Sequence, residues 1–162
     1  MKIRKFYFKK VNSTNNTAIN IIQNSNLNFG MVISEIQKKG KGQYGRKWIS
    51  HKGNLFASFF FNLNNINLSI KQITKINCLL VKKTIAYFYK RKITFKAPND
   101  LLVNGKKISG ILQETITKNN LKYLIVGIGI NIIKSPNINN YPTTNLFDLT
   151  GKKISYKLTV NL

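Results

Sequence analysis

The sequence predicts an α+β domain with a mixed, largely antiparallel sheet and helices packed on it. Three observations support this class. Strand-like apolar runs come before and after a long helical pattern, without regular strand and helix alternation. Residues 70–87 carry apolar side chains at helical spacing. An Asn-Gly pair at 104–105 separates two alternating runs, which is a strong signal for a two-residue hairpin.

The first half of the chain predicts strands, one short helix and a long loop. The NSTNN cluster at 12–16 can cap the helix, and the polar NSN at 24–26 ends it. The segment 38–54 contains four glycines and has no apolar periodicity, so we expect a long functional loop there. The expected elements, in order, are a strand at 3–8, a helix starting at Thr17, a strand at 31–37 opened by Gly30, the loop at 38–54 and a buried strand at 55–63.

The second half predicts a long helix and then several strands. Ser69 is placed to cap the helix, which ends near Tyr89. The remaining expected elements are a strand at 92–95, a hairpin at 101–116, a strand at 121–133, a loop at 134–141 and a last helix capped by Ser155. A chain of 162 residues has room for one core, so we expect a single domain over 1–162.

The composition excludes several kinds of active site. Four acidic residues are too few for a two-metal hydrolase or a glycosidase, which gather carboxylates. The single His51 and the single Cys78 exclude a multi-histidine or cysteine metal site and an internal disulfide, so no protein metal centre is expected. A lone cysteine fits a reducing compartment, and we expect a cytoplasmic location.

The formal net charge of +23 raises the question of nucleic-acid binding. The lysines are scattered over the whole chain, only three basic residues are arginines, and Asn and Ile are also in excess. This pattern favours a biased composition with a solvated basic surface over a dedicated DNA site. No apolar run approaches the length of a membrane span, and no secretory signal is evident, so we expect no membrane association.

Three segments carry residues suited to anion chemistry. GKGQYGRKW at 40–48 combines backbone freedom with positive charge, although a flexible surface loop would look the same. KAPND at 96–100 presents Lys96 and Asp100 from a turn stiffened by Pro98, or is simply a turn that ends a strand. KKISG at 106–110 places Lys107 on a strand, where alternation predicts that it shares a face with Ser109. An exposed lysine is the alternative interpretation.

Together these segments resemble the catalytic domain of biotin protein ligases. The resemblance extends to STN at 13–15 and to VGIGIN at 126–131, and covers about four-fifths of the chain. It implies a class II aminoacyl-tRNA synthetase-like fold, the biotin–lipoate ligase catalytic domain. It also implies an enzyme that activates biotin with ATP to biotinyl-5'-AMP and then transfers it to a lysine of a biotin carboxyl carrier domain.

The resemblance assigns roles residue by residue. Lys107 and Asp100 are the implied catalytic residues, and Mg²⁺ is expected to accompany ATP. The implied biotin site consists of Ser13, Thr14, Asn15, Gln37, Gly40, Lys41, Gly42, Gln43 and Lys107. The implied nucleotide site consists of Arg46, Trp48, Lys96, Asn99, Asp100 and Asn131. The loop is expected to close over the adenylate and exclude water.

The chain also departs from the family pattern. Lys41 stands where many members have Arg, and Ala97 replaces a common Trp. We expect neither the N-terminal DNA-binding domain of repressor-type members nor the small C-terminal β-domain within this chain. The expected partner is the carboxyl carrier protein of acetyl-CoA carboxylase or a related carboxylase, and a homodimer is left open. A lipoate- or octanoate-type acyltransferase of the same fold is the nearest alternative, and a basic nucleic-acid-binding module the distant one.

Overall fold

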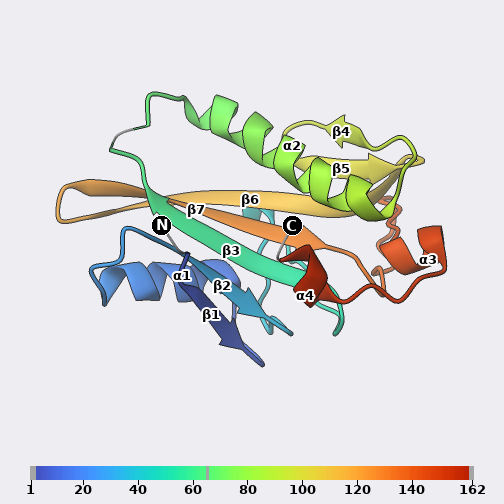
Figure 1. The fold of residues 1–162 in the computed structure, drawn as a ribbon, viewed down its shortest axis with the longest axis horizontal. Helices are drawn as coiled ribbons and strands as arrows, with labels where there is room; N and C mark the ends of the chain where they lie inside the picture. The colour runs from blue at the N-terminus through green and yellow to red at the C-terminus, as the bar shows by residue number, and fades with distance from the viewer. Residues whose placement is uncertain (1–2, 65, 161–162) are drawn as a thin grey trace. The chain divides into compact units, whose positions relative to one another are not determined.

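A computed structural model describes residues 3–64 and 66–160. The helices are α1 (Thr14–Gln23), α2 (Ile70–Phe88), α3 (Leu146–Thr150) and α4 (Tyr156–Thr159). The strands are β1 (Lys5–Phe8), β2 (Phe29–Ser34), β3 (Leu55–Asn62), β4 (Thr94–Lys96), β5 (Asp100–Val103), β6 (Lys106–Lys118) and β7 (Leu121–Ile130). The strands are hydrogen-bonded in the order β1-β2-β3-β7-β6-β5-β4 (Figure 1).

The sheet is mixed, as the sequence predicts. Strands β1 and β2 pair in parallel, whereas β2 with β3, β4 with β5 and β5 with β6 pair antiparallel. The α+β class is therefore confirmed. Within the described ranges, no helix combines the length and the apolar character needed to cross a membrane.

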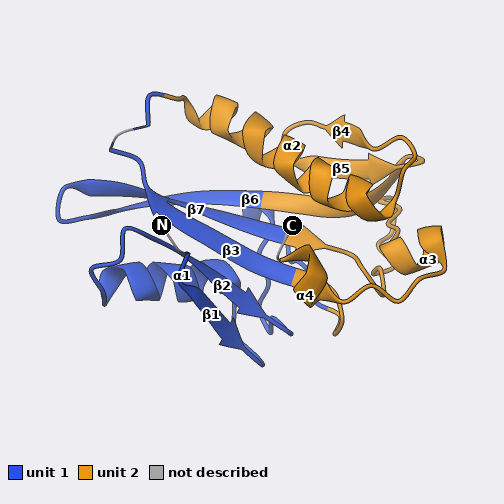
Figure 2. Cartoon of the chain, in the orientation of Figure 1, with its two compact units in different colours: residues 1–50, 56–67, 112–128 blue, residues 51–55, 68–111, 129–162 orange. Residues whose placement is uncertain are grey.

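The chain divides into two compact units, which are described separately (Figure 2). Unit 1 comprises residues 1–50, 56–67 and 112–128, and unit 2 comprises residues 51–55, 68–111 and 129–162. Each unit is assembled from several chain segments, and β6 and β7 contribute residues to both. The single domain over 1–162 stays a prediction.

In unit 1, helix α1 packs its apolar side against the sheet. Ala18 and Ile22 are fully buried in a core shared with Val32 of β2, Phe60 of β3 and Ile125 of β7. Such burial stabilises each large side chain by roughly 1.5–3 kcal/mol. The prediction that the helix starts at Thr17 is wrong by three residues. Ser13 caps the helix, because its side chain accepts a hydrogen bond from the N–H of Asn16.

The opposite end of α1 is closed by a lysine from a distant strand. The Nζ atom of Lys118 on β6 lies 2.9 Å from the carbonyl oxygen of Ile22 and 2.5 Å from that of Ser25. A cation at a helix C-terminus satisfies carbonyls that lack helical partners and complements the helix dipole. Strand β2 ends at Ser34, earlier than the predicted end at Gln37. Gln37 instead forms an isolated parallel bridge with Val11.

In unit 2, helix α2 begins at the predicted cap, Ser69, which the structure shows to be part of a capping box. The Ser69 hydroxyl accepts from the N–H of Gln72, and the Gln72 side chain accepts from the N–H of Ser69. The buried face of α2 consists of Ile73, Cys78, Val81 and Ile85, and the helix contacts β5. The predicted hairpin is also confirmed: Asn104 and Gly105 adopt φ values of 50° and 75° between β5 and β6.

Asn54 determines where the chain leaves β7. Its Oδ1 accepts hydrogen bonds from the N–H groups of Ile132, Ile133 and Lys134 at 3.0, 2.9 and 3.2 Å. Its Nδ2 donates to the carbonyl oxygen of Lys134 at 2.7 Å, and the residue is fully buried. These bonds replace ladder bonds, so β7 ends at Ile130 and the predicted extension to Ile133 is wrong.

Asn54→Leu is expected to destabilise the protein by on the order of 3 kcal/mol, because several buried backbone groups would lose their partner at once. Denaturant unfolding measures the effect. Asn137→Leu, at an exposed position three residues after Lys134, is the matched control and should change stability by less than about 0.5 kcal/mol. An equal loss in both variants would contradict the role of Asn54.

Cys78 is a free, buried thiol on α2. Burial, with a smaller effect of the Asp100 carboxylate, raises the pKa of the thiol from 9.0 to about 11. The unfolded chain releases this proton near pH 9 while the folded chain retains it. The thiol should therefore make stability fall as the pH rises from 9 toward 11. Unfolding titrations of wild type and Cys78→Ala measure this, since the variant should lose less stability over that range; parallel pH profiles would contradict it.

Candidate functional site

A network of polar side chains surrounds the first turn of α1 in unit 1. The N–H and hydroxyl of Thr14 lie 2.8 and 3.0 Å from Oε1 of Gln37. The Ser58 hydroxyl donates to Oδ1 of Asn15 at 2.5 Å and lies 2.8 Å from the Thr14 hydroxyl. Ser13, Thr14, Asn15 and Ser58 are all buried. Polar groups buried in such a network hold one another in fixed orientations.

Two further residues fix Asn15. Its Nδ2 donates to Oε2 of Glu114 on β6 at 2.7 Å. Gly127 on β7 lies directly against the same amide, since a Cβ atom at Gly127 would be 2.3 Å from Oδ1 of Asn15. The glycine is required for the close approach and not for a special backbone angle, because its φ lies outside the positive range in which L side chains are strained.

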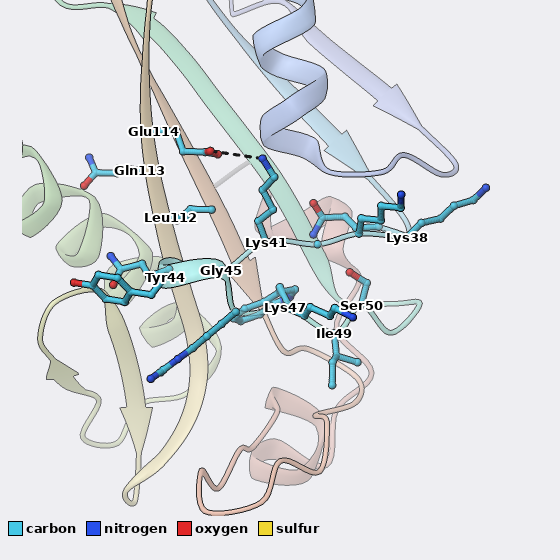
Figure 3. A pocket seen from close by; sticks show the side chains of 17 residues that line it. Lys38, Lys41, Tyr44, Gly45, Lys47, Ile49, Ser50, Leu112, Gln113 and Glu114 are labelled. Atoms are coloured by element: carbon cyan, nitrogen blue, oxygen red, sulfur yellow. Dashed lines mark ion pairs between the residues drawn. The ribbon is translucent and has the colours of Figure 1, made fainter.

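A cavity of about 1170 Å³ lies beside this network in unit 1 (Figure 3). Residues 37–50 line one part of it, and Leu112, Gln113 and Glu114 of β6 line another. The volume slightly exceeds the usual range for small-molecule sites, and the lining includes the cationic residues Lys38, Lys39, Lys41, Arg46 and Lys47. The cavity is therefore suited to a polar ligand with an anionic group.

The segment from Gly40 to Trp48 is a tight loop. Lys41 and Lys47 form an isolated antiparallel bridge, and the N–H of Trp48 donates to the carbonyl of Gly40 at 2.9 Å. Tyr44 and Gly45 turn the loop with φ values of 54° and 73°. The sequence predicted a long loop but not this internal pairing. Tyr44 is 90% exposed at the turn.

Lys41 connects the loop to the polar network. Its Nζ lies 3.8 Å from Oε1 of Glu114 and 2.7 Å from Oδ1 of Asn16. Figure 3 shows the side chain pointing toward Glu114, whereas Lys38 points away. Both members of the Lys41 and Glu114 pair are partly exposed, so the ion pair contributes little to stability. A ligand anion can therefore compete for Lys41 at small cost.

Unit 2 contains a second cluster, which we call the Asp100 cluster: Lys96, Asp100, Lys107 and Tyr141. The Nζ of Lys107 lies 2.8 Å from Oδ1 of Asp100, and the Tyr141 hydroxyl donates to Oδ2 at 2.5 Å. Lys96 and Lys107 place their Nζ atoms 4.5 and 5.5 Å from the centre of the Tyr141 ring. The side chains of Lys107 and Asp100 are only 18% and 13% exposed.

A β-bulge orients Lys107. Leu101 of β5 pairs with Ser109, but its neighbour Leu102 pairs with Lys107, so the pairing skips Ile108. Cross-strand partners share a face, and Leu101 and Leu102 lie on opposite faces. The prediction that Lys107 and Ser109 share a face is therefore wrong. Ser109 is buried and donates to the carbonyl of Gly129 at 2.7 Å, while Lys107 is left to contact Asp100.

Two other predicted nucleotide residues of unit 2 make backbone contacts. Asn99 Nδ2 donates to the carbonyl of Ile111 at 2.6 Å, which ties the KAPND turn to β6. Asn131 is 1% exposed, and its Nδ2 donates to the carbonyl of Thr144 at 3.1 Å. Its buried Oδ1 has no hydrogen-bond partner among the described residues. Both side chains shape the backbone around the Asp100 cluster.

Comparison with known proteins shows which family the chain belongs to. A model of the biotin/lipoate A/B protein ligase family matches residues 7–131. The chain belongs to this family. It is 30% identical over 156 residues to the bifunctional ligase/repressor BirA of Bacillus subtilis, covering 91% of this chain and 47% of the relative. It is 35% identical over 125 residues to biotin–protein ligase 2 of Arabidopsis thaliana, covering 70% and 35%.

The fold agrees with solved members of the family. Biotin protein ligase from Aquifex aeolicus in complex with biotin and ATP superposes with a TM-score of 0.82 and 30% identity. The match covers 98% of this chain and 66% of that one. The chain spans only part of the length of the curated relatives it matches, 47% for the Bacillus subtilis protein and 35% for the Arabidopsis thaliana protein. The biotin–lipoate ligase fold expected from the motifs is thus confirmed.

The structure gathers the predicted site residues into two groups. Unit 1 holds Ser13, Thr14, Asn15, Gln37, Gly40, Lys41, Gly42, Gln43, Arg46 and Trp48, and unit 2 holds Lys96, Asn99, Asp100, Lys107 and Asn131. Sequence reasoning missed Ser58, Glu114 and Tyr141 as members of the clusters. Ser58 lies within an apolar strand and Tyr141 within a polar loop, so neither carries a signal. Glu114 could have been noticed as one of only four acids.

Proposed function

We propose that this biotin/lipoate ligase family member is an ATP-dependent biotin protein ligase. It forms biotinyl-5'-AMP and transfers the biotinyl group to a lysine of a biotin carboxyl carrier domain. The observation that carries the proposal is the Asp100 cluster. In a chain with four acids, two lysine ammonium groups lie over one ring and one of them, that of Lys107, pairs with a carboxylate, which suits a triphosphate.

The first step joins two anions. A biotin carboxylate oxygen attacks the α-phosphorus, the bond from that phosphorus to the bridging oxygen breaks, and pyrophosphate leaves. Catalysis of such a step is mainly positioning and charge neutralisation. Lys107 supplies a compact, partly desolvated cation that can neutralise first the biotin carboxylate and then the phosphate. Asp100 and Tyr141 hold this ammonium in place before the substrates bind.

The cavity of unit 1 is the proposed biotin site. A ureido ring presents one carbonyl and two N–H groups. Of the three residues that we propose for recognising it, Gln37 lines the cavity, whereas Thr14 and Asn15 belong to the buried network beside it. Gly40, Gly42 and Gln43 line the cavity wall together with Lys41, which supplies one cation. The loop that ends at Trp48 is proposed to close over the adenylate, as Arg46 and Trp48 approach the nucleotide. Excluding water would protect the mixed anhydride from hydrolysis.

The residues present fit a magnesium ion held mainly by the nucleotide. Among the described residues, no group of three or more His, Cys, Asp or Glu side chains could hold a metal. Mg²⁺ usually keeps several waters and binds through one or two carboxylates plus substrate phosphates. Asp100 is the carboxylate we propose for this role, and the ion would supply further charge neutralisation at the phosphates.

In the second step the ε-amine of the acceptor lysine attacks the acyl carbon of the adenylate. The amine loses a proton, and AMP leaves. The proposed acceptor is the carboxyl carrier protein of acetyl-CoA carboxylase or a related carboxylase. We place the reaction in the cytoplasm, which supplies ATP and keeps a lone cysteine such as Cys78 reduced. A homodimer and the absence of DNA binding stay predictions.

A lipoate- or octanoate-type acyltransferase is the competing function. Isothermal titration of the chain with biotin, and separately with lipoate and octanoate, distinguishes the two. We expect saturable biotin binding and no heat of binding from the fatty acids, because their chains offer nothing to the polar network around Asn15. Tight lipoate binding together with absent biotin binding would overturn the proposal in favour of the alternative.

A further inference from the structure

We infer that Tyr141 is a positioning residue for the nucleotide: its ring holds the ammonium groups of Lys96 and Lys107 toward the phosphates, and its hydroxyl fixes Asp100. The inference rests on the proposed function, since it assigns the Asp100 cluster to ATP. Tyr141 lies after the residues that match the family model, which end at 131.

The loop that carries Tyr141 is pinned to the start of β6. The N–H of Lys107 donates to the carbonyl of Pro142 at 2.8 Å, and the N–H of Thr144 donates to the carbonyl of Lys107 at 2.9 Å. Thr143 and Lys107 thereby form an isolated parallel bridge. The Tyr141 N–H also donates to the carbonyl of Ile138 at 3.2 Å, closing a turn. The ring is therefore held next to Lys107 by backbone geometry.

The Tyr141 ring reduces the electrostatic repulsion between Lys96 and Lys107. Lys96 and Lys107 carry like charges, and both lie within 5.5 Å of the same ring centre. An aromatic face attracts cations through its quadrupole, so it offsets part of the repulsion between the two ammonium groups. The single carboxylate of the cluster faces Lys107, whereas Lys96 is exposed, so the ring is the contact that the two lysines share.

The hydroxyl has a separate effect on Asp100. It donates to Oδ2, while Lys107 contacts Oδ1. Each carboxylate oxygen thus has its own partner, and the side chain is held in one orientation. When Lys107 moves toward a substrate anion, the hydroxyl stays on Asp100 and limits the cost of breaking the ion pair. Ring and hydroxyl can be separated experimentally by Phe and Leu substitutions.

The test measures binding of Mg²⁺-ATP to the purified full chain without biotin, by titration calorimetry. Tyr141→Leu should weaken ATP binding about tenfold, because two cation–π contacts are lost. Tyr141→Phe keeps the ring and should stay within about threefold of wild type. Biotin affinity should be unchanged in both, since Tyr141 does not line the proposed biotin cavity. Tyr87→Leu is the matched control: its exposed ring lies under Lys90 at 5.5 Å on α2, outside the cluster.

Lys96→Met keeps the inference testable if Tyr141→Leu unfolds. This exposed substitution should weaken ATP binding by itself. The loss should be the same in a Tyr141→Phe background, because Phe keeps the ring that contacts Lys96 and removes only the hydroxyl that contacts Asp100. A folded Tyr141→Leu with wild-type ATP affinity overturns the inference, as does a Phe variant as weak as Leu or an equal loss of biotin affinity.

The inference and the proposed function can fail separately. Wild-type ATP binding that depends on Tyr141, without any biotin-dependent chemistry, leaves the inference standing and removes the biotin ligase function. If wild type and Tyr141→Leu both adenylate biotin and bind ATP with equal affinity, the biotin ligase function stands and the inference about Tyr141 is removed. A wild-type chain without measurable ATP affinity overturns both.

Discussion

Lys107→Met should form biotinyl-5'-AMP about a thousandfold more slowly than the wild type while retaining its fold. Removing one preorganised charge-stabilising group from an active site typically costs about 10²–10³ in rate. An apolar chain of similar length fills the same space but neutralises neither the carboxylate nor the phosphate. Biotin-dependent exchange of labelled pyrophosphate into ATP measures the first step directly.

The stability of this variant needs its own measurement. Asp100 is only 13% exposed and would lose its ion-pair partner, which lowers stability. The Tyr141 hydroxyl still donates to the carboxylate, so we expect a lower melting temperature and a native far-UV spectrum. Lys106→Met, at the exposed neighbouring position, is the matched control and should exchange pyrophosphate normally. Full exchange by a folded Lys107→Met chain would remove Lys107 from the mechanism.

Gly127→Ala is expected to weaken biotin binding by about tenfold to a hundredfold. The new methyl group would lie 2.3 Å from Oδ1 of Asn15, closer than any van der Waals contact allows. Asn15 must move, and its bonds to Ser58 and Glu114 would be lost or strained. A displaced Asn15 would lose one or two hydrogen bonds to biotin, and at about 1–1.5 kcal/mol each this accounts for a change of this size. Titration calorimetry with biotin measures it.

A double-mutant cycle tests the cause. In an Asn15→Ala background the clash partner is absent, so Gly127→Ala should add less than about threefold to the loss. ATP affinity should be unchanged, because neither Gly127 nor Asn15 belongs to the Asp100 cluster. Independent and fully additive effects of the two substitutions would show that Gly127 acts by another route.

Local signals predicted much of the fold. The capping box at Ser69 and Gln72, the Asn104 and Gly105 turn, and the helical spacing of α2 depend only on neighbouring residues. Element ends were less predictable where a distant side chain decides them. Asn54 ends β7 by accepting hydrogen bonds from backbone groups about 80 positions later in the chain. The sequence around β7 gives no sign of these bonds.

The candidate site was likewise predictable where motifs are local and unpredictable where distant residues meet. The glycine-rich loop, the KAPND turn and Lys107 could be identified because each motif is continuous in the sequence. The orientation of Lys107 could not, because the bulge at Ile108 depends on pairing with β5. Tyr141 reaches Asp100 from 41 positions away. Family resemblance supplied the residue roles, whereas alternation by itself placed Lys107 on the wrong face.

The most direct test of the central claim measures the exchange of pyrophosphate into ATP by the purified chain. The exchange is measured in parallel with biotin, lipoate or octanoate as the carboxylic acid substrate. Biotin ligase function predicts rapid exchange with biotin, background exchange with the two fatty acids, and loss of the biotin signal in Lys107→Met. Exchange driven by lipoate or octanoate but not by biotin would contradict the account, as would the absence of exchange with any of the three.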